Sequence, residues 1–271
     1  MLFLCYIFQL FHLALTDEIL YNHSNSEDNL YFVFTTFRHG ARFPFVKKDY
    51  FGNNISSPGS LTTYGGIQHL EIGKKYRERY SNFLNMSFDK NEFYIRSSNV
   101  ERTIVSTEKE LEGFFNKPIK RTNFHIIKNP NFMNLFNLDD KEHEEMEKYQ
   151  NYCKKRNLEF NYKKIFYTEI FPILEKCYGT ENTTEFYSFC DSVYTAYFQY
   201  TYGNDTTNKI GKCKENVQKI YDFCYNWFNS MRGWSEYGAY LFYKFYQHIF
   251  DYMNNAINKS SLIKMVNIWG A

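Results

Sequence analysis

The order of strand and helix signals constrains the fold of this 271-residue chain more than any other feature. Residues 29–37 (NLYFVFTTF) are rich in aromatic and β-branched side chains, as strands are, and residues 62–80 have the apolar spacing of a helix. A second short strand is predicted at 92–96, and a second helix follows it. This alternation predicts an α/β domain whose largely parallel sheet is flanked by helices.

The second helix and the end of the chain extend this pattern. Asn99 precedes the second helix, where a side-chain amide is a suitable N-cap. The apolar residues that recur at helical spacing are Val100, Ile104, Leu111 and Phe114. Residues 236–257 predict a long aromatic helix, and residues 264–269 (KMVNIW) predict a third, buried strand. The residues near the end of the sequence are therefore predicted to belong to the α/β core.

The middle of the chain has a different character. Residues 131–233 are charged, aromatic and patterned as helices, and they contain every cysteine except Cys5. This stretch is predicted to form a helical cap subdomain inserted into the α/β core. The core is then expected in two parts, residues 17–130 and 234–271.

The first residues predict entry into the secretory pathway. Residues 2–15 are apolar apart from Gln9 and His12, a run too short to span a membrane but of the length of a signal-peptide core. Residues 1–16 are therefore predicted to be removed as a signal peptide, and the alternative is a buried first strand or helix. No other stretch is long and apolar enough to span a bilayer. The location predicted for the protein is secreted or lysosomal.

Glycosylation motifs and cysteines agree with export. Six Asn-x-Ser/Thr motifs begin at Asn22, Asn54, Asn85, Asn182, Asn204 and Asn258. Without Cys5, five cysteines remain, and this odd number implies a free thiol or a missing partner. The net charge of +2 is too small to indicate a nucleic-acid partner.

The motif that carries chemistry follows the first predicted strand directly. Residues 38–44 read RHGARFP, so that Arg38 and Arg42 flank His39. In open α/β sheets, ligands bind beyond the carboxyl ends of the strands. Arginine binds phosphate oxygens in a bidentate way, and a neutral imidazole can act as a nucleophile. The alternative is a surface loop with solvated charges, but the five fixed residues of RHGxRxP occur by chance on the order of once in ten thousand such chains.

RHGxRxP resembles the signature of the histidine acid phosphatases, a branch of the phosphoglycerate-mutase-like superfamily. Residues 61–77 resemble the LTxxGxxQ helix of that family through Leu61, Thr62, Gly65, Gln68, Gly73 and Arg77. Residues 94–103 (YIRSSNVERT) resemble the segment that supplies a further phosphate-binding arginine, with Asn99 and Glu101 where the family usually or often has Asp. The resemblance covers roughly residues 29–115 and 236–271.

This resemblance implies a role for each residue of the motif. His39 would be the nucleophile that becomes phosphohistidine, and Arg38, Arg42 and Arg96 would hold the phosphoryl oxygens. The alternative for Arg96 is a structural ion pair, for example with Glu101 or Glu92. A structural role is predicted for Arg102.

The same resemblance implies a phosphate monoester substrate and no metal or organic cofactor. His69 and His23 lack a second ligand at a spacing that suits zinc. Phosphoproteins and the phosphates of sugars, lipids and inositols all remain open as substrates, and so does the oligomeric state.

The family also needs a His-Asp pair, whose aspartic acid protonates the leaving oxygen. Residues 265–271 resemble the strand and turn before that pair, and no His-Asp dipeptide occurs in the sequence. We therefore expect the sequence to be truncated before this motif. One alternative is a catalytically impaired phosphate-binding protein on the same fold. The other is an extracellular structural glycoprotein, against which RHGxRxP argues.

Overall fold

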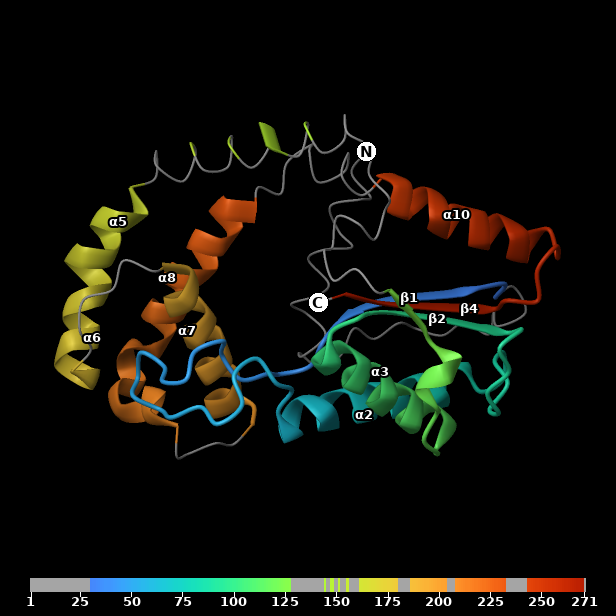
Figure 1. Ribbon diagram of the computed structural model, residues 1–271, viewed down its shortest axis with the longest axis horizontal. Helices are drawn as coiled ribbons and strands as arrows, with labels where there is room; N and C mark the ends of the chain where they lie inside the picture. Colours follow the sequence, from blue (N-terminus) through green and yellow to red (C-terminus); the bar gives the residue numbers. More distant parts are fainter. Residues whose placement is uncertain are drawn as a thin grey trace, which may run out of the picture. The chain divides into compact units, whose positions relative to one another are not determined.

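The computed structural model of the chain (Figure 1) describes residues 30–127, 161–179, 186–203, 208–232 and 243–270, together with 144, 147, 148, 151 and 155. The chain divides into two compact units, Met1–Leu30 and Tyr31–Ala271, and the second unit contains the described fold. The predicted signal peptide lies outside the described residues. Within the described ranges, no helix combines the length and the apolar character that crossing a bilayer requires.

A four-stranded parallel sheet forms the α/β core, as the sequence predicts. Its strands are β1 (Val33–Arg38), β2 (Phe93–Ser98), β3 (His125–Ile127) and β4 (Met265–Gly270), in the order β1-β4-β2-β3. The last strand of the chain thus lies between the first two, and Ile268 pairs with both Thr36 and Arg96. Three of the strands were predicted. The edge strand β3 was not, because three residues are too few to show a periodic pattern.

Helices cover both faces of this sheet (Figure 1). On one face, α2 (Thr63–Tyr80) and α3 (Glu101–Phe115) bury a core that includes Phe93 and Ile95 of β2. Successive side chains of a strand point to opposite faces, so Tyr94 points away from this core. Its ring lies 5.2 Å from that of Tyr252 on α10 (Tyr243–Ile257). Residues 236–242 of the predicted long helix lie outside the described residues.

The helices α2 and α3 cross with their backbones in contact. A Cβ atom on Gly73 of α2 would overlap the carbonyl oxygen of Glu110, and one on Gly113 of α3 would overlap that of Leu70. Glycine at these two positions therefore allows the short distance between α2 and α3. This distance also determines how far apart the N-terminal turns of the two helices lie.

The prediction that Asn99 caps α3 is wrong. The N-cap residue is Val100, which makes no side-chain capping hydrogen bond, and Asn99 is exposed. The reason is that Val100 is still extended, with φ −126° and ψ 122°, so the helix begins at Glu101 and Asn99 is one residue too early. Thr62, in contrast, does cap α2, because its side chain accepts a hydrogen bond from the Gly65 amide.

The described part of residues 131–233 is helical, as predicted. Its elements are α5 (Tyr162–Ile165), a π-helical turn (Phe166–Ile170), α6 (Phe171–Tyr178), α7 (Phe186–Thr201), a 3-10 turn (Lys209–Cys213) and α8 (Lys214–Arg232). These helices bury an aromatic core of their own. A disulfide between Cys190 and Cys224 joins α7 to α8, and Cys177 is also disulfide-bonded. Phe51, from the loop after the RHGARFP motif, is buried in the same core.

Candidate active site

The RHGARFP loop begins at the carboxyl end of β1 and is fastened to both neighbouring helices. The amide of Ala41 donates to Oε1 of Gln68 on α2 (2.8 Å), and the hydroxyl of Thr62 donates to the Ala41 carbonyl (2.8 Å). The amide of Gly40 donates to Oγ of Ser106 on α3 (3.0 Å). Thr62 and Gln68 are residues of the LTxxGxxQ resemblance, so this segment fixes the backbone of the loop.

Two glycines allow the loop to lie this close to α2. A Cβ atom on Gly40 would overlap the carbonyl of Gly65, and a Cβ atom on Gly65 would overlap the carbonyl of Ala41. The first turn of α2 therefore packs directly on the backbone beside His39.

The imidazole of His39 has a defined orientation. Its Nδ1 atom lies 2.8 Å from the carbonyl oxygen of Gly40. A carbonyl can only accept, so Nδ1 carries the proton and Nε2 carries the lone pair. Nε2 is buried and has no hydrogen-bond partner within the described part of the chain. The ring thus presents an unshared electron pair in a partly closed site.

The surroundings of His39 keep it neutral in acid. Burial is the largest cause, and together with nearby positive charge it lowers the pKa of His39 to about 3. The charges that act in this direction belong to Arg38, Arg102 and Arg42, while the hydrogen bond to Gly40 opposes them. At pH values well above 3, His39 is therefore largely unprotonated.

Arg42 is buried and held by the helical stretch. Its Nη1 atom donates to Oδ2 of Asp191 on α7 (3.2 Å), and its Nη2 atom donates to Oδ1 of the same carboxylate. Nη1 also donates to the carbonyl of Phe43 (2.9 Å), and the guanidinium lies 4.0 Å from the ring centroid of Phe45. Arg42 therefore lies near His39 and forms a buried ion pair with Asp191, and its phosphate-binding role stays a prediction.

Arg102, for which a structural role was predicted, also lies in this cluster. Its guanidinium is 5.2 Å from the Phe45 ring centroid, and its Nε atom is buried without a hydrogen-bond partner in the described ranges. Burial and Arg42 lower the pKa of Arg102. Arg102 lies one turn before Ser106 on α3, and Ser106 accepts a hydrogen bond from the Gly40 amide, so both residues lie on the side of α3 that faces the loop.

Arg38 and Arg96 occupy different places. Arg38 precedes His39, is exposed, and contributes to the lowered pKa of His39. Arg96 lies in register with Thr36, earlier along the sheet, and its charge acts on Tyr252 of α10. It is not among the charges that shift the pKa of His39.

The two acidic residues proposed as alternative partners of Arg96 pair with other cations. Glu101 pairs with Arg121, and Glu92 pairs with Lys264. The structure thus places Arg38, Arg42 and Arg102 among the charges that lower the pKa of His39. The phosphate-binding role of Arg96 stays a prediction.

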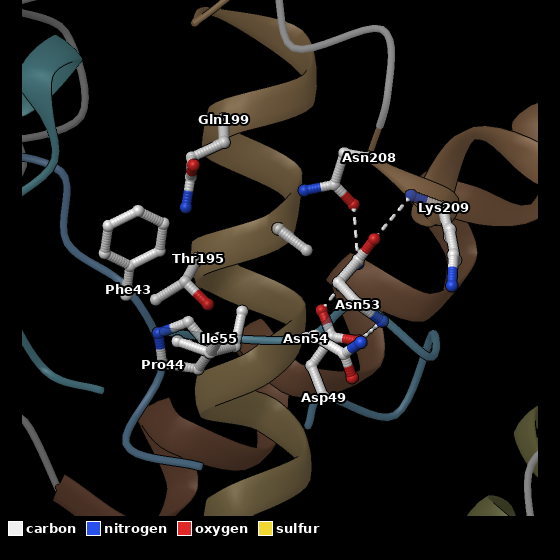
Figure 2. A pocket seen from close by; sticks show the side chains of 11 residues that line it. Phe43, Pro44, Asp49, Asn53, Asn54, Ile55, Thr195, Gln199, Asn208 and Lys209 are labelled. Carbon is white, nitrogen blue, oxygen red and sulfur yellow. Dashed lines mark hydrogen bonds between the residues drawn. The ribbon is translucent and has the colours of Figure 1, made fainter. Parts of the chain in front are cut away.

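A cavity of about 200 Å³ with a mixed polar and apolar lining begins beside the loop (Figure 2). Phe43 and Pro44 of the RHGARFP motif form one wall, and Thr195 and Gln199 of α7 form another. The amide of Asn53 closes one side, where it donates to Asp49 (2.7 Å) and to Asn208 (3.0 Å). The cavity therefore lies between the candidate catalytic loop and the helical stretch.

Comparison with known proteins agrees with this geometry. Residues 29–263 match the model of the histidine phosphatase superfamily, branch 2. The chain belongs to this family, which confirms the resemblance found in the sequence.

Individual relatives match a shorter part of the sequence. Human lysosomal acid phosphatase is 40% identical over 91 residues, which are 32% of this chain and 22% of that protein. Bovine prostatic acid phosphatase is 36% identical over 93 residues, which are 32% of this chain and 23% of that protein. The matched segment therefore spans less than a quarter of these relatives.

Solved structures show the same fold. The phytase from Citrobacter braakii superposes with a TM-score of 0.54 at 16% identity, covering 89% of this chain and 72% of the phytase. The phytase of Klebsiella sp. ASR1 gives a TM-score of 0.54 at 13% identity, covering 89% and 68%.

Proposed function

We propose that this protein hydrolyses phosphate monoesters through a phosphohistidine at His39. The observation that carries the proposal is the state of Nε2, which is buried, unprotonated, free of hydrogen bonds to the described residues and surrounded by arginines. Membership of the histidine phosphatase superfamily supports it.

The reaction follows in two steps. The Nε2 lone pair attacks phosphorus, an N–P bond forms, and the P–O bond to the leaving group breaks. Water then attacks the phosphorus, the N–P bond breaks, and inorganic phosphate leaves with His39 regenerated. Arg38, Arg42 and Arg102 would stabilise the negative charge of the phosphoryl oxygens, and the carbonyl of Gly40 would hold the Nδ1 proton throughout.

The leaving oxygen must also receive a proton. Asp191 is the carboxylate recorded in this cluster, and it accepts hydrogen bonds from Arg42 and from the amide of Phe45. Because three N–H donors already point at its carboxylate, Asp191 is placed as an anchor for Arg42. No proton donor to the leaving oxygen is therefore assigned among the described residues of this cluster.

The cavity beside the loop supports a polar leaving group. Gln199 and Thr195 line it from α7, and Asn53 and Asn208 line it from two other segments. These side chains could form hydrogen bonds with hydroxyl groups of a leaving group, and Phe43, Pro44, Ile55 and Ala196 add apolar surface to the same cavity. A secretory location is part of the same proposal, supported by the Cys190–Cys224 disulfide and by relatives named lysosomal acid phosphatase.

Trapping the intermediate tests this function. The chain is mixed with a phosphate-labelled aryl monoester, quenched in alkali and counted for protein-bound label. We expect label on the wild type and none on His39→Ala. His125→Ala is the matched control, because His125 is an exposed histidine stacked on Tyr94 at the sheet edge, and it should keep the label.

The outcomes separate the candidate functions. Label that survives His39→Ala contradicts the assignment of the nucleophile. Phosphate binding without any label favours a phosphate-binding protein instead of an enzyme.

A further inference from the structure

Asp191 reaches into the candidate active site from a distant part of the sequence. It lies on α7, 149 residues from Arg42, and its side chain is only 8% exposed. Its carboxylate accepts hydrogen bonds from Nη1 and Nη2 of Arg42 and from the amide of Phe45 (3.1 Å). This buried carboxylate thus connects α7 of the helical stretch to the catalytic loop through hydrogen bonds.

The geometry of the Arg42 guanidinium shows what this contact leaves available. A guanidinium has five N–H donors, which form one fork at its end and another along its side. Asp191 takes the end fork, at Nη1 and Nη2. The side fork, made by Nε–H and the remaining N–H of Nη2, has no hydrogen bond to any described residue, and this edge can bind a phosphoryl oxygen pair.

Asp191 therefore fixes the plane of the Arg42 guanidinium through the end fork and leaves the side fork unoccupied by any described residue. The Phe45 ring, 4.0 Å from the guanidinium, restricts the same plane from one face. The backbone of Phe45 is itself tied to Asp191, so the anchor and the stacking ring move together. A preorganised cation of this kind stabilises developing charge more effectively than a mobile one.

A competing interpretation is that Asp191 imitates phosphate and must be displaced before substrate binds. Three N–H donors hold the carboxylate in a buried place. Its removal would leave a buried charge without partners, which is strongly unfavourable. The neighbouring residue Cys190 is also joined to α8 by the Cys190–Cys224 disulfide, which restrains this turn of α7.

We propose that Asp191 is a positioning residue, which aims the side fork of Arg42 at the phosphoryl group. This inference rests on the proposed phosphatase function and deepens it, because it makes the helical stretch part of the catalytic apparatus. The negative charge of Asp191 also acts on Arg102, where it opposes the lowering of the pKa by burial and by Arg42. Asp191 therefore interacts favourably with the positive charge of both arginines.

Substitution of Asp191 separates positioning from a merely structural role. In Asp191→Asn the charge and one acceptor are lost, and Arg42 can rotate. We expect kcat to fall by between about tenfold and a hundredfold, as misplacement of a catalytic group by about 1 Å does. KM should not rise, because the site becomes more positive. Asp191→Glu should recover part of the lost kcat.

Ser192→Ala is the matched control. Ser192 is a buried neighbour on α7, and its hydroxyl bonds only within the helix, to the carbonyl of Ser188. Its kcat should stay within about twofold of the wild type, as for substitutions that leave the site in place. A lowered Tm with unchanged kcat in Asp191→Asn would reduce Asp191 to a structural residue, and a raised kcat/KM would make it a competitor of phosphate.

A measurement on the wild-type chain keeps the proposal testable if the variants do not fold. Hydrogen exchange of the Phe45 amide, which donates to Asp191, is followed by NMR while inorganic phosphate is added. Protection that persists at saturating phosphate supports positioning, and protection that is lost shows displacement and overturns it. Because this readout needs no turnover, it is independent of the trapping of phosphohistidine, which decides the proposed function.

Discussion

At the scale of single residues, the reactivity of His39 is set by its own backbone and by burial. The Gly40 carbonyl selects the tautomer, because it fixes the proton on Nδ1 and leaves Nε2 as the basic atom. Burial and three arginines keep that atom unprotonated in acid. A histidine in this state can act as a nucleophile at the pH of a lysosome, where an ordinary histidine would be largely protonated.

Arg102 and Arg96 can be distinguished by their effect on this protonation. Burial is the main cause that lowers the pKa of His39 to about 3, and Arg102 is one of the charges that contribute, whereas the charge of Arg96 acts on Tyr252. Arg102→Gln should therefore raise the pKa of His39, and Arg96→Gln should leave it unchanged.

The direction in which the rate of phosphohistidine formation changes with pH follows from the proposed role of His39 as the nucleophile. Protonated His39 cannot attack phosphorus, so the rate of phosphohistidine formation falls as pH drops through its pKa. In Arg102→Gln this loss should begin at a higher pH than in the wild type, and rates at pH 4 to 5 should fall relative to pH 7. The measurement is the pH dependence of single-turnover label formation, and an acid limb that moves in Arg96→Gln instead would restore the role first predicted for Arg96.

At the scale of elements, the site depends on how closely α2 and α3 cross. Their N-terminal turns carry Thr62, Gln68 and Ser106, the three side chains that hold the RHGARFP loop. Gly73 and Gly113 bring the two backbones into contact further along the helices. A change in the distance or angle at which α2 and α3 cross would therefore move the three side chains that hold the loop.

Two glycines of α2 offer a controlled test of this crossing. In Gly73→Ala the new methyl group would overlap the Glu110 carbonyl, and we expect a loss of stability of about 1–3 kcal/mol. In Gly66→Ala the nearest atom is Cγ of Lys109 at 3.8 Å, so there is room, and helix propensity favours alanine by about 1 kcal/mol. Urea denaturation of both variants gives the two free energies of unfolding. Equal values would mean that the helices do not touch at Gly73.

Much of the element order was predictable, and the exceptions have local causes. The strands β1, β2 and β4 are rich in aromatic or β-branched residues, which a sequence shows directly. The start of α3 was misplaced because the backbone of Val100 stays extended, and nothing in the side chains indicates this. The position of Arg102 depends on the angle at which α3 meets the loop, which is a tertiary property. Asp191 could not be found at all, since no motif surrounds it.

At the scale of the whole molecule, the candidate site draws on segments far apart in the sequence. The loop after β1 supplies His39 and Arg42, α3 supplies Arg102, and α7 supplies Asp191. The sheet and the helical stretch have separate hydrophobic cores, and the loop contributes Phe51 to the helical one. Catalysis would therefore require both cores to be folded.

The proposed function requires Nε2 of His39 to be the atom that accepts the phosphoryl group. The most direct test is NMR of the trapped, alkali-stable phosphoprotein, which distinguishes phosphate on Nε2 from phosphate on Nδ1. We expect phosphate on Nε2 alone, because Nδ1 donates its proton to the Gly40 carbonyl. Phosphate on Nδ1, or on any residue other than His39, would contradict it.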